Sequence, residues 1–150
     1  GLIGHRSFLA GAVETPGLVL PPKPIEHLTY EGLVSTVDLA ATIADLGGCD
    51  VPAGVAGRSL LPLLRGEDLE GPASQAVISE FGRRLMFETE RYKVIFDVQT
   101  REALGMYDML HDSEERTNLV QSPKGRNLLD ALRWRLGDVL LPIRAVARGG

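Results

Sequence analysis

The stretch that decides the fold is VISEFGRRLMFETERYKVIFD, residues 77–97. At both ends of this stretch apolar and polar side chains alternate with a period of two, which is the period of a β-strand. The two interruptions, at residues 82–83 and 90–91, are short enough for hairpin turns. We therefore predict an antiparallel meander of three strands, joined by a fourth near residues 104–109.

A helix that follows the meander is expected to cover one of its faces. Ser122 followed by Pro123 is typical of a helix start, because proline lacks an amide that the first turn would leave without a partner. The helix should run to about Leu141. Its apolar stripe consists of Leu129, Leu132, Leu136, Val139 and Leu140. A sheet of this size needs such a cover, so we expect packing onto alternate side chains from Tyr92 to Phe96 and an α+β fold.

A second amphipathic helix is predicted near the start of the chain. Ser35 stands three residues before Asp38, so the serine caps the helix and the acid lies near its positive end. One face carries Leu39, Ile43 and Leu46, flanked by Ala40, Ala41 and Ala44. Gly47 and Gly48 end the helix with a positive φ.

The segments on either side of this helix contain many turn-forming residues. Residues 49–58 form an irregular connection, and Ser59 then caps one helical turn within Leu60–Leu64. Residues 67–74 form a polar loop. Residues 1–34 are interpreted as loop with a short edge strand.

That edge strand is placed at Leu18–Leu20, because the prolines at 21, 22 and 24 fix φ and withhold amide donors. The chain opens on Gly1, without Met and without the apolar run of a signal peptide, which we interpret as an internal boundary.

The composition excludes several classes of protein. The chain has 150 residues, 44% of them hydrophobic, with 16 Lys and Arg against 20 Asp and Glu. Disorder and collagen are excluded, and no basic run exists for nucleic acid or an anionic membrane. No apolar stretch approaches the roughly 20 residues of a membrane-spanning helix. A single cysteine forms no internal disulfide, which leaves the compartment open and slightly favours the cytoplasm.

The reactive side chains do not form a complete active site. Cys49 follows two glycines at a helix end and precedes an acid, which is typical of a connector. His5, His27 and His111 are scattered, with no pair at the helical spacing of a metal site.

The densest cluster of acids suggests calcium at first sight. It consists of Asp108, Asp112, Glu114 and Glu115, together with His111. No glycine lies between Asp108 and Asn118 to form the sharp turn of a calcium loop, so a capped, solvated turn is the better interpretation.

Several segments, in order, resemble the carboxy-terminal part of sulfatases of the alkaline phosphatase superfamily. They include VSTVDL (34–39), GRSLLPLLRG (57–66), RYKVI (91–95), MYDM (106–109) and the turn at 112–119. The resemblance covers about residues 30–140. It implies that residues 35–150 are a sulfatase carboxy-terminal subdomain of an alkaline-phosphatase-like α/β fold, and that residues 1–34 are the tail of a catalytic domain.

The resemblance also implies a chemistry. In that family a Cys or Ser in a Cys/Ser-x-Pro-x-Arg motif becomes a formylglycine hydrate that attacks sulfur beside a divalent cation, typically calcium. Cys49 departs from the motif, because Pro52 is displaced and no arginine follows. The metal carboxylates of the family lie in its amino-terminal portion, so no metal or cofactor ligand is assigned here.

One substrate contact is carried over from the family. The stretch from Leu2 to His5 loosely resembles the family's Leu-Gly-Glu-His-Gly, after which a lysine contacts the sulfate. Ala10 stands at the place of that lysine. His5 alone is therefore assigned, as a substrate-pocket residue.

These observations lead to one main hypothesis and two alternatives. The chain is expected to be the carboxy-terminal portion of a hydrolase of sulfate esters, inactive alone, whose partner is the remainder of the catalytic domain. The alternatives are a free-standing interaction module and a fragment of a phosphonate or phosphodiester hydrolase. The faces around Leu60–Leu64 and the Ala40/Ala44 side of the first helix should be uncovered, so self-association is expected.

Overall fold

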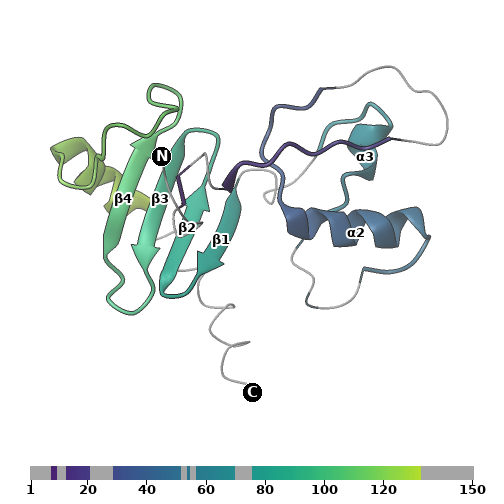
Figure 1. Ribbon diagram of the computed structural model, residues 1–150, viewed down its shortest axis with the longest axis horizontal. Coiled ribbons are helices and arrows are strands. Elements are labelled where there is room, and N and C mark those ends of the chain that lie inside the picture. The colour runs from purple at the N-terminus through teal and green to yellow at the C-terminus, as the bar shows by residue number, and fades with distance from the viewer. Residues whose placement is uncertain are drawn as a thin grey trace.

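The computed structural model describes residues 8–9, 13–20, 29–51, 54, 57–69 and 76–132. Figure 1 shows an antiparallel sheet at one end of the molecule and two helices at the other. The sheet, together with the helical segment 123–132, is called the sheet lobe below; residues 29–51 and 57–69 are called the helical lobe. Within the described residues no helix has the length and apolar character needed to span a bilayer.

The sheet has the predicted order and direction. It contains β1 (Val77–Phe81), β2 (Arg84–Glu88), β3 (Tyr92–Asp97) and β4 (Ala103–Asp108), each antiparallel to the next. The β1–β2 hairpin turns at Gly82, whose φ of 61° is costly for any other residue. The meander predicted from the period of two is confirmed, and its fourth strand lies within one residue of the expected position.

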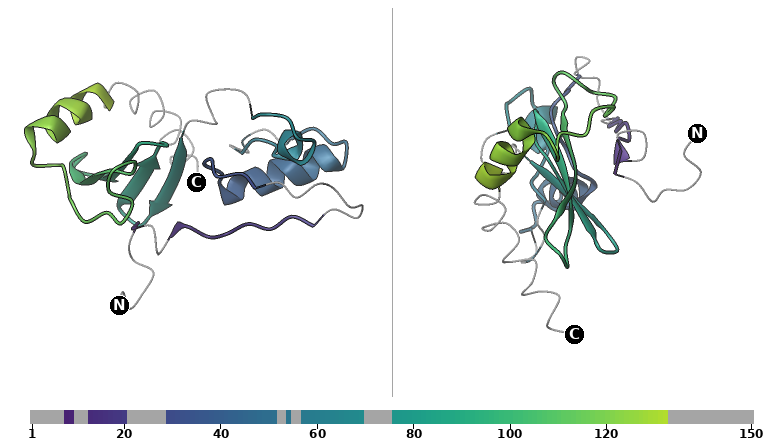
Figure 2. Two further views of the ribbon diagram at one scale, coloured as in Figure 1. Left: turned by 90° about the horizontal axis from the view of Figure 1, so that it is seen from above. Right: turned by 90° about the vertical axis from the view of Figure 1, so that its left-hand side faces the viewer.

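One face of the sheet forms the hydrophobic core. Phe87, Val94 and Met106 stand side by side across β2, β3 and β4, and all three are buried. The helical segment 123–132 covers this face, as Figure 2 shows. Leu129 belongs to the core cluster, and Leu132 packs against it from a half-buried position. The predicted cover is confirmed for the described part; Leu136, Val139 and Leu140 lie outside the described residues.

The other face of the sheet carries charge beside apolar side chains. Lys93 pairs in register with Glu88 on β2 and with Tyr107 on β4. Figure 2 shows the described amino-terminal residues on this side, opposite the helical segment 123–132. The two faces thus differ: one is a purely apolar core, and the other buries ions.

The helical lobe begins where the serine cap predicts. Helix α2 (Thr36–Leu46) follows Ser35, whose amide donates to the Asp38 carboxylate at 2.8 Å. Helix α3 (Leu61–Leu64) is the expected single turn. Gly57 lies so close to α2 that a β-carbon would come within 2.1 Å of the Val37 carbonyl oxygen. This approach lets the next amide reach the other oxygen of Asp38.

The apolar stripe of α2 does not face a core within the described chain. Leu39, Ile43 and Leu46 are all exposed, Ile43 to 69%. The buried residues of α2 are Asp38, Ala41 and Thr42. The expected amphipathic helix forms, but α3 and its connecting loop pack on its small and polar side, so its larger apolar side stays open.

The predicted edge strand at Leu18–Leu20 is wrong for the described chain. Residues 14–20 are extended but belong to no strand. Leu18 and Leu20 are more than 80% exposed. Among the described residues no neighbouring strand provides hydrogen bonds to this segment, so its apolar residues alone do not make it a strand.

Candidate functional site

The residues singled out from the sequence are not brought together by the structure. His5, the predicted substrate-pocket residue, and His27 lie outside the described residues. Cys49 is a free, exposed thiol, and its Sγ lies 3.7 Å from the Gly47 carbonyl oxygen. No base is paired with this thiol among the described residues, which agrees with its interpretation as a connector residue.

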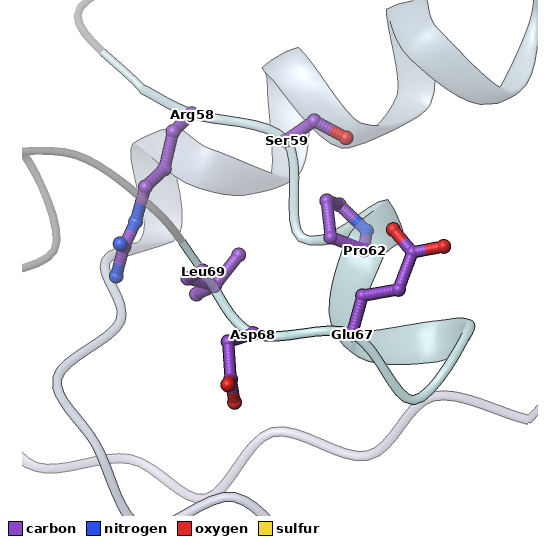
Figure 3. A pocket seen from close by; sticks show the side chains of 6 residues that line it. All are labelled: Arg58, Ser59, Pro62, Glu67, Asp68 and Leu69. Carbon is purple, nitrogen blue, oxygen red and sulfur yellow. The ribbon is translucent and has the colours of Figure 1, made fainter.

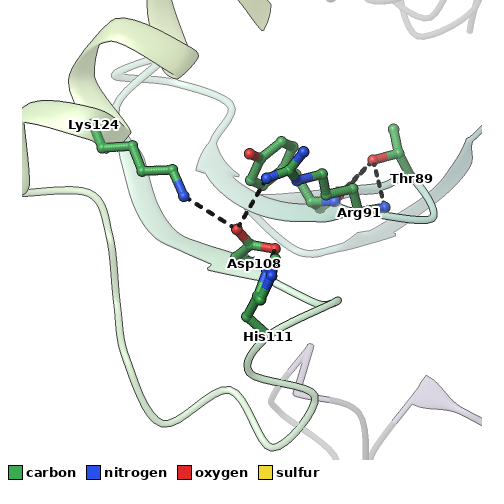
Figure 4. A network of polar contacts seen from close by, with 6 residues as sticks. Thr89, Arg91, Asp108, His111 and Lys124 are labelled. Carbon is green, nitrogen blue, oxygen red and sulfur yellow. Dashed lines mark hydrogen bonds and ion pairs between the residues drawn. The ribbon is translucent and has the colours of Figure 1, made fainter.

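His111 belongs to a network centred on Asp108 (Figure 4). Asp108 lies at the end of β4, and its side chain is only 8% exposed. Its carboxylate meets His111 Nδ1 at 3.1 Å, Lys124 Nζ at 3.3 Å and Arg91 Nη2 at 3.7 Å. The three partners come from the β2–β3 turn, the turn after β4 and the helical segment 123–132. Asp108 therefore ties the helical cover to the end of the sheet at which β3 begins and β4 ends.

The groups around Asp108 favour its ionised form over its protonated form. The hydrogen bond with His111, aided by Lys124 and Arg91, holds the pKa of Asp108 below its usual value of 3.8, against the opposing effect of desolvation. A shallow pocket of about 330 Å³ lies beside these groups. His111 and Lys124 line it with exposed side chains, and each could donate to an anion, but both already donate to Asp108.

A second ionic cluster, which the sequence analysis missed, lies on the opposite face of the sheet. Lys93 is fully buried, and its Nζ lies 2.6 Å from Glu115 Oε1 and 3.1 Å from Glu88 Oε2. Burial raises the pKa of Glu88, while Lys93 works in the opposite direction. One signal in the sequence could have revealed part of the cluster: Lys93 stands between Tyr92 and Val94 in a predicted strand, and the preceding predicted strand carries the acid Glu88.

The turn from residue 109 to residue 118 is only partly the solvated turn that was expected. Asp112 does cap it, because its carboxylate accepts from the amides of Arg116 and Thr117 at 3.0 and 2.7 Å. Glu115, however, is buried on Lys93 and has a φ of 54°, an uncommon conformation for a residue other than glycine. The expectation of solvated acids is wrong for Glu115 and for Asp108. Both are buried, Glu115 in an ion pair with Lys93 and Asp108 in an ion pair with Lys124.

The larger pocket lies in the helical lobe (Figure 3). It measures about 550 Å³, and its lining includes Arg58, Glu67 and Asp68. Arg58 Nη2 donates to the Leu33 carbonyl at 2.9 Å, and Nη1 is buried without a hydrogen bond within the described chain. Its backbone amide donates to Asp38 at 3.0 Å. Arg58 therefore fixes the connecting loop to the start of α2.

These clusters hold the fold together, and none forms a reaction centre. Catalysis of ester cleavage needs a nucleophile, a base within hydrogen-bond reach and a group that stabilises the developing anion. No described residues combine these three. No group of three His, Cys, Asp or Glu side chains in the described part of the chain is placed to hold a metal ion, so these residues do not fit the calcium that the sequence resemblance implies for the complete enzyme.

Comparison with known proteins shows which family this chain resembles in sequence. The family model described as "N-sulphoglucosamine sulphohydrolase, C-terminal" matches residues 1–140. The Delta 4,5-hexuronate-2-O-sulfatase of Bacteroides thetaiotaomicron is 35% identical over 133 residues, which are 83% of this chain and 27% of that protein. Both matches cover the helical lobe and the sheet lobe together.

Solved structures agree with this match. The structure of a 2-O GAG sulfatase is similar with a TM-score of 0.58 and 33% identity, over 75% of this chain and 26% of that one. A phosphonate monoester hydrolase from Silicibacter pomeroyi shares the fold at 23% identity, with a TM-score of 0.54 over 72% of this chain and 24% of that one. The chain spans about a quarter of the length of the relatives that it matches.

Proposed function

The chain belongs to the sulfatase family, in the region described as N-sulphoglucosamine sulphohydrolase, C-terminal, and from this membership we propose that it is the carboxy-terminal portion of an enzyme that hydrolyses sulfate esters. The observation that carries the proposal is the match of one family model to residues 1–140. The substrate class that we propose is a sulfated carbohydrate, because the similar proteins at 33–35% identity are named for hexuronate and GAG substrates.

The proposed role of this chain is to complete the enzyme. The sheet lobe provides a rigid, covered sheet, and its ionic clusters at Asp108 and Lys93 fix the turns at the ends of β3 and β4. Turns held in this way can place side chains against a neighbouring catalytic domain, since sites need rigid support. The nucleophile and the divalent cation, proposed as calcium, belong to the amino-terminal portion of the complete enzyme. His5 stays a prediction as a substrate-pocket residue.

Two alternatives lead to different expectations. A phosphonate or phosphate ester hydrolase is compatible with the fold shared with the phosphonate monoester hydrolase, a likeness that concerns the fold alone. A free-standing interaction module would need no amino-terminal portion. The open apolar stripe of α2 weighs against that module, since a surface of this kind calls for a cover.

The test compares two polypeptides: the 150-residue chain and the product of the complete reading frame. Each is assayed with 4-nitrophenyl sulfate, a 2-O-sulfated uronate disaccharide, 4-nitrophenyl phosphate and a phenyl phosphonate ester, with calcium and after chelation. We expect the 150-residue chain to be inactive on all four. The complete polypeptide should release sulfate, and chelation should abolish the reaction.

Three results would contradict the proposal. Turnover by the 150-residue chain alone that a single substitution removes would place a reaction centre in it. A complete polypeptide that cleaves the phosphonate ester faster than either sulfate ester would favour the first alternative. A reading frame that encodes no Cys/Ser-x-Pro-x-Arg motif upstream of this region would favour the interaction module.

A further inference from the structure

The network around Asp108 contains more hydrogen-bond donors than the Asp108 carboxylate uses. His111 Nδ1 and Lys124 Nζ each donate to this carboxylate once, and Arg91 Nη2 lies 3.7 Å from it. An ammonium group has three N–H donors, and a charged imidazole donates from both of its ring nitrogens. Within the described chain the side chains of His111 and Lys124 make no other hydrogen bond. Each of the two can therefore serve a second acceptor.

These donors stand around a cavity. The side chains of His111 and Lys124 are 72% and 59% exposed, and both line the pocket of about 330 Å³. The other lining residues are Asp108, Asp112, Thr117 and Leu119. The volume lies at the lower end of the range of ligand pockets, about 300–1,000 Å³. Since the lining includes a hydroxyl and an apolar side chain beside the cations, the pocket offers contacts to more than a bare ion.

Asp108 holds the two cationic side chains in place. Its own side chain is only 8% exposed, and Figure 4 shows His111 and Lys124 on two sides of its carboxylate. A long side chain loses rotational freedom when it binds a ligand, and this loss weakens binding. Because the folded chain has already fixed both side chains on Asp108, a ligand in the pocket meets donors whose freedom is restricted in advance.

The charges around the pocket are compatible with an anion. Three basic side chains meet two acids: Arg91, His111 and Lys124 against Asp108 and Asp112. Both oxygens of Asp112 already accept backbone amides, at 3.0 and 2.7 Å. The oxygens of Asp108 are likewise occupied by its cationic partners. A metal ion fits less well, because no group of three possible metal ligands converges anywhere in the described part of the chain.

We propose that this pocket binds an oxyanion of a sulfated carbohydrate, with Lys124 and His111 as the donors. The inference rests on the proposed function, which supplies the ligand: a sulfated carbohydrate chain carries several anionic groups, and one beyond the ester that is cleaved can occupy this pocket. Leu119 offers an apolar wall to a sugar ring, and Thr117 offers a hydroxyl. Inorganic sulfate has the same oxyanion chemistry, so the test includes both sources.

The first experiment follows the ring signal of His111 by NMR in the complete polypeptide with isotope-labelled histidine. His111→Gln assigns the signal by removing it. The probes are a heparin-derived tetrasaccharide, inorganic sulfate and the uncharged maltotetraose, at about pH 6, where an imidazole can carry a positive charge. A chelator at one concentration in every sample stops the proposed hydrolysis. We expect saturable shifts with the first two probes, a lower Kd for the tetrasaccharide, and no shift with maltotetraose.

The second experiment repeats this titration with two matched variants. Lys124→Met and Arg83→Met each remove a cation from an ion pair, and the two side chains are 59% and 58% exposed. Lys124 lines the pocket, and Arg83 does not. Lys124→Met should raise the Kd of the tetrasaccharide at least about tenfold, because a charge-assisted hydrogen bond is lost. Arg83→Met should change it by less than about twofold, because its charge lies away from the pocket.

Several results would overturn the inference. These are a His111 signal that no probe moves, an equal shift with maltotetraose, or equal Kd values for the two variants. Saturation by inorganic sulfate but not by the tetrasaccharide would contradict the carbohydrate as ligand. If Lys124→Met prevents folding, the titration of the unaltered polypeptide still decides.

The failure of this inference can be told from the failure of the proposed function, because the NMR readout does not depend on turnover. A complete polypeptide that cleaves no sulfate ester but shows the expected shifts would support the pocket and overturn the proposed function. A polypeptide that releases sulfate while the His111 signal stays unmoved would overturn the inference alone.

Discussion

The two lobes of this molecule follow the same local rules, but only one of them covers its own apolar surface. In the sheet lobe, the leucine stripe of the helical segment 123–132 lies on the sheet, and Leu129 is buried in the core. In the helical lobe, the stripe of α2 has the same helical spacing, but Ile43 is 69% exposed. Amphipathic spacing therefore predicts a face that will be covered and does not tell whether the cover lies in the same chain.

The largest expected effect tests how strongly the sheet lobe depends on its buried ions. Lys93→Met removes the buried positive charge that pairs with both Glu88 and Glu115, and breaking a buried ion pair from one side costs about 3–5 kcal/mol. Urea denaturation of the 150-residue chain at pH 7 measures the loss. The loss should shrink at pH 5, where a buried carboxyl escapes its charge by binding a proton.

The matched control for that variant is Lys124→Met. Lys124 pairs with Asp108 at 3.3 Å, but its side chain is 59% exposed, so the expected cost is below about 1 kcal/mol. If the two lysine variants were equally stable, the buried cluster would not contribute more to the sheet lobe than a surface pair does.

The next effect compares the two stripes directly. Leu129→Ala should destabilise the 150-residue chain by about 2–5 kcal/mol, because it leaves a cavity in the core. Ile43→Ala should change stability by less than about 0.5 kcal/mol, since the side chain already faces water. Thermal unfolding followed by circular dichroism checks both.

An intermediate case sharpens this comparison. Leu132 packs against the core cluster from a half-buried position, so the loss of stability caused by Leu132→Ala should fall between those of the other two variants. A large effect of Ile43→Ala would show that the α2 stripe is covered in solution, and sedimentation would then test the predicted self-association as its cause.

A smaller effect distinguishes the two ionic clusters of the sheet lobe by pH. The pKa of Asp108 is lowered, so its contribution to stability is present above pH 3.8 and is lost as pH falls through the lowered value. The pKa of Glu88 is raised, so stability falls as pH rises above 4.5 through the raised value. Denaturant titrations at several pH values from about 2.5 to about 7 measure how the free energy of unfolding changes with pH in these two ranges.

Two single variants assign these changes to residues. Asp108→Asn should reduce the increase of stability that accompanies rising pH below 3.8. Glu88→Gln should reduce the decrease of stability that accompanies rising pH above 4.5. If Asp108→Asn left the acid limb of the profile unchanged, the hydrogen bond with His111 would not favour the ionised carboxylate in solution.

The smallest expected effect is that of Cys49→Ser. The thiol is exposed at the end of α2 and lies 3.7 Å from a carbonyl oxygen, so the change in stability should stay within about 0.5 kcal/mol. In the complete polypeptide, sulfate release should be unaffected as well. A loss of more than about tenfold in rate, a change of about 1.4 kcal/mol in the barrier, would show that this cysteine takes part in the reaction.

The sequence by itself determined the local elements of this protein. The period of two predicts the meander, the serine caps predict where α2 and the last helix begin, and the leucine spacing predicts the cover of the sheet. Each of these signals arises from neighbours within a few residues, for which backbone geometry and capping are sufficient. The resemblance to sulfatases likewise depends on ordered short motifs, and the family match confirms it.

The tertiary structure alone decided which groups meet across the chain. Lys93 meets Glu115 only because β3 and the turn after β4 lie on one face of the sheet, and Asp108 is contacted by Arg91, His111 and Lys124 from three separate segments. The same holds for burial: α2 and the segment at Leu18–Leu20 have the pattern of buried elements but are exposed in the described chain. A pattern of side chains records what an element needs from its surroundings, whereas burial depends on surfaces that distant parts of a polypeptide provide.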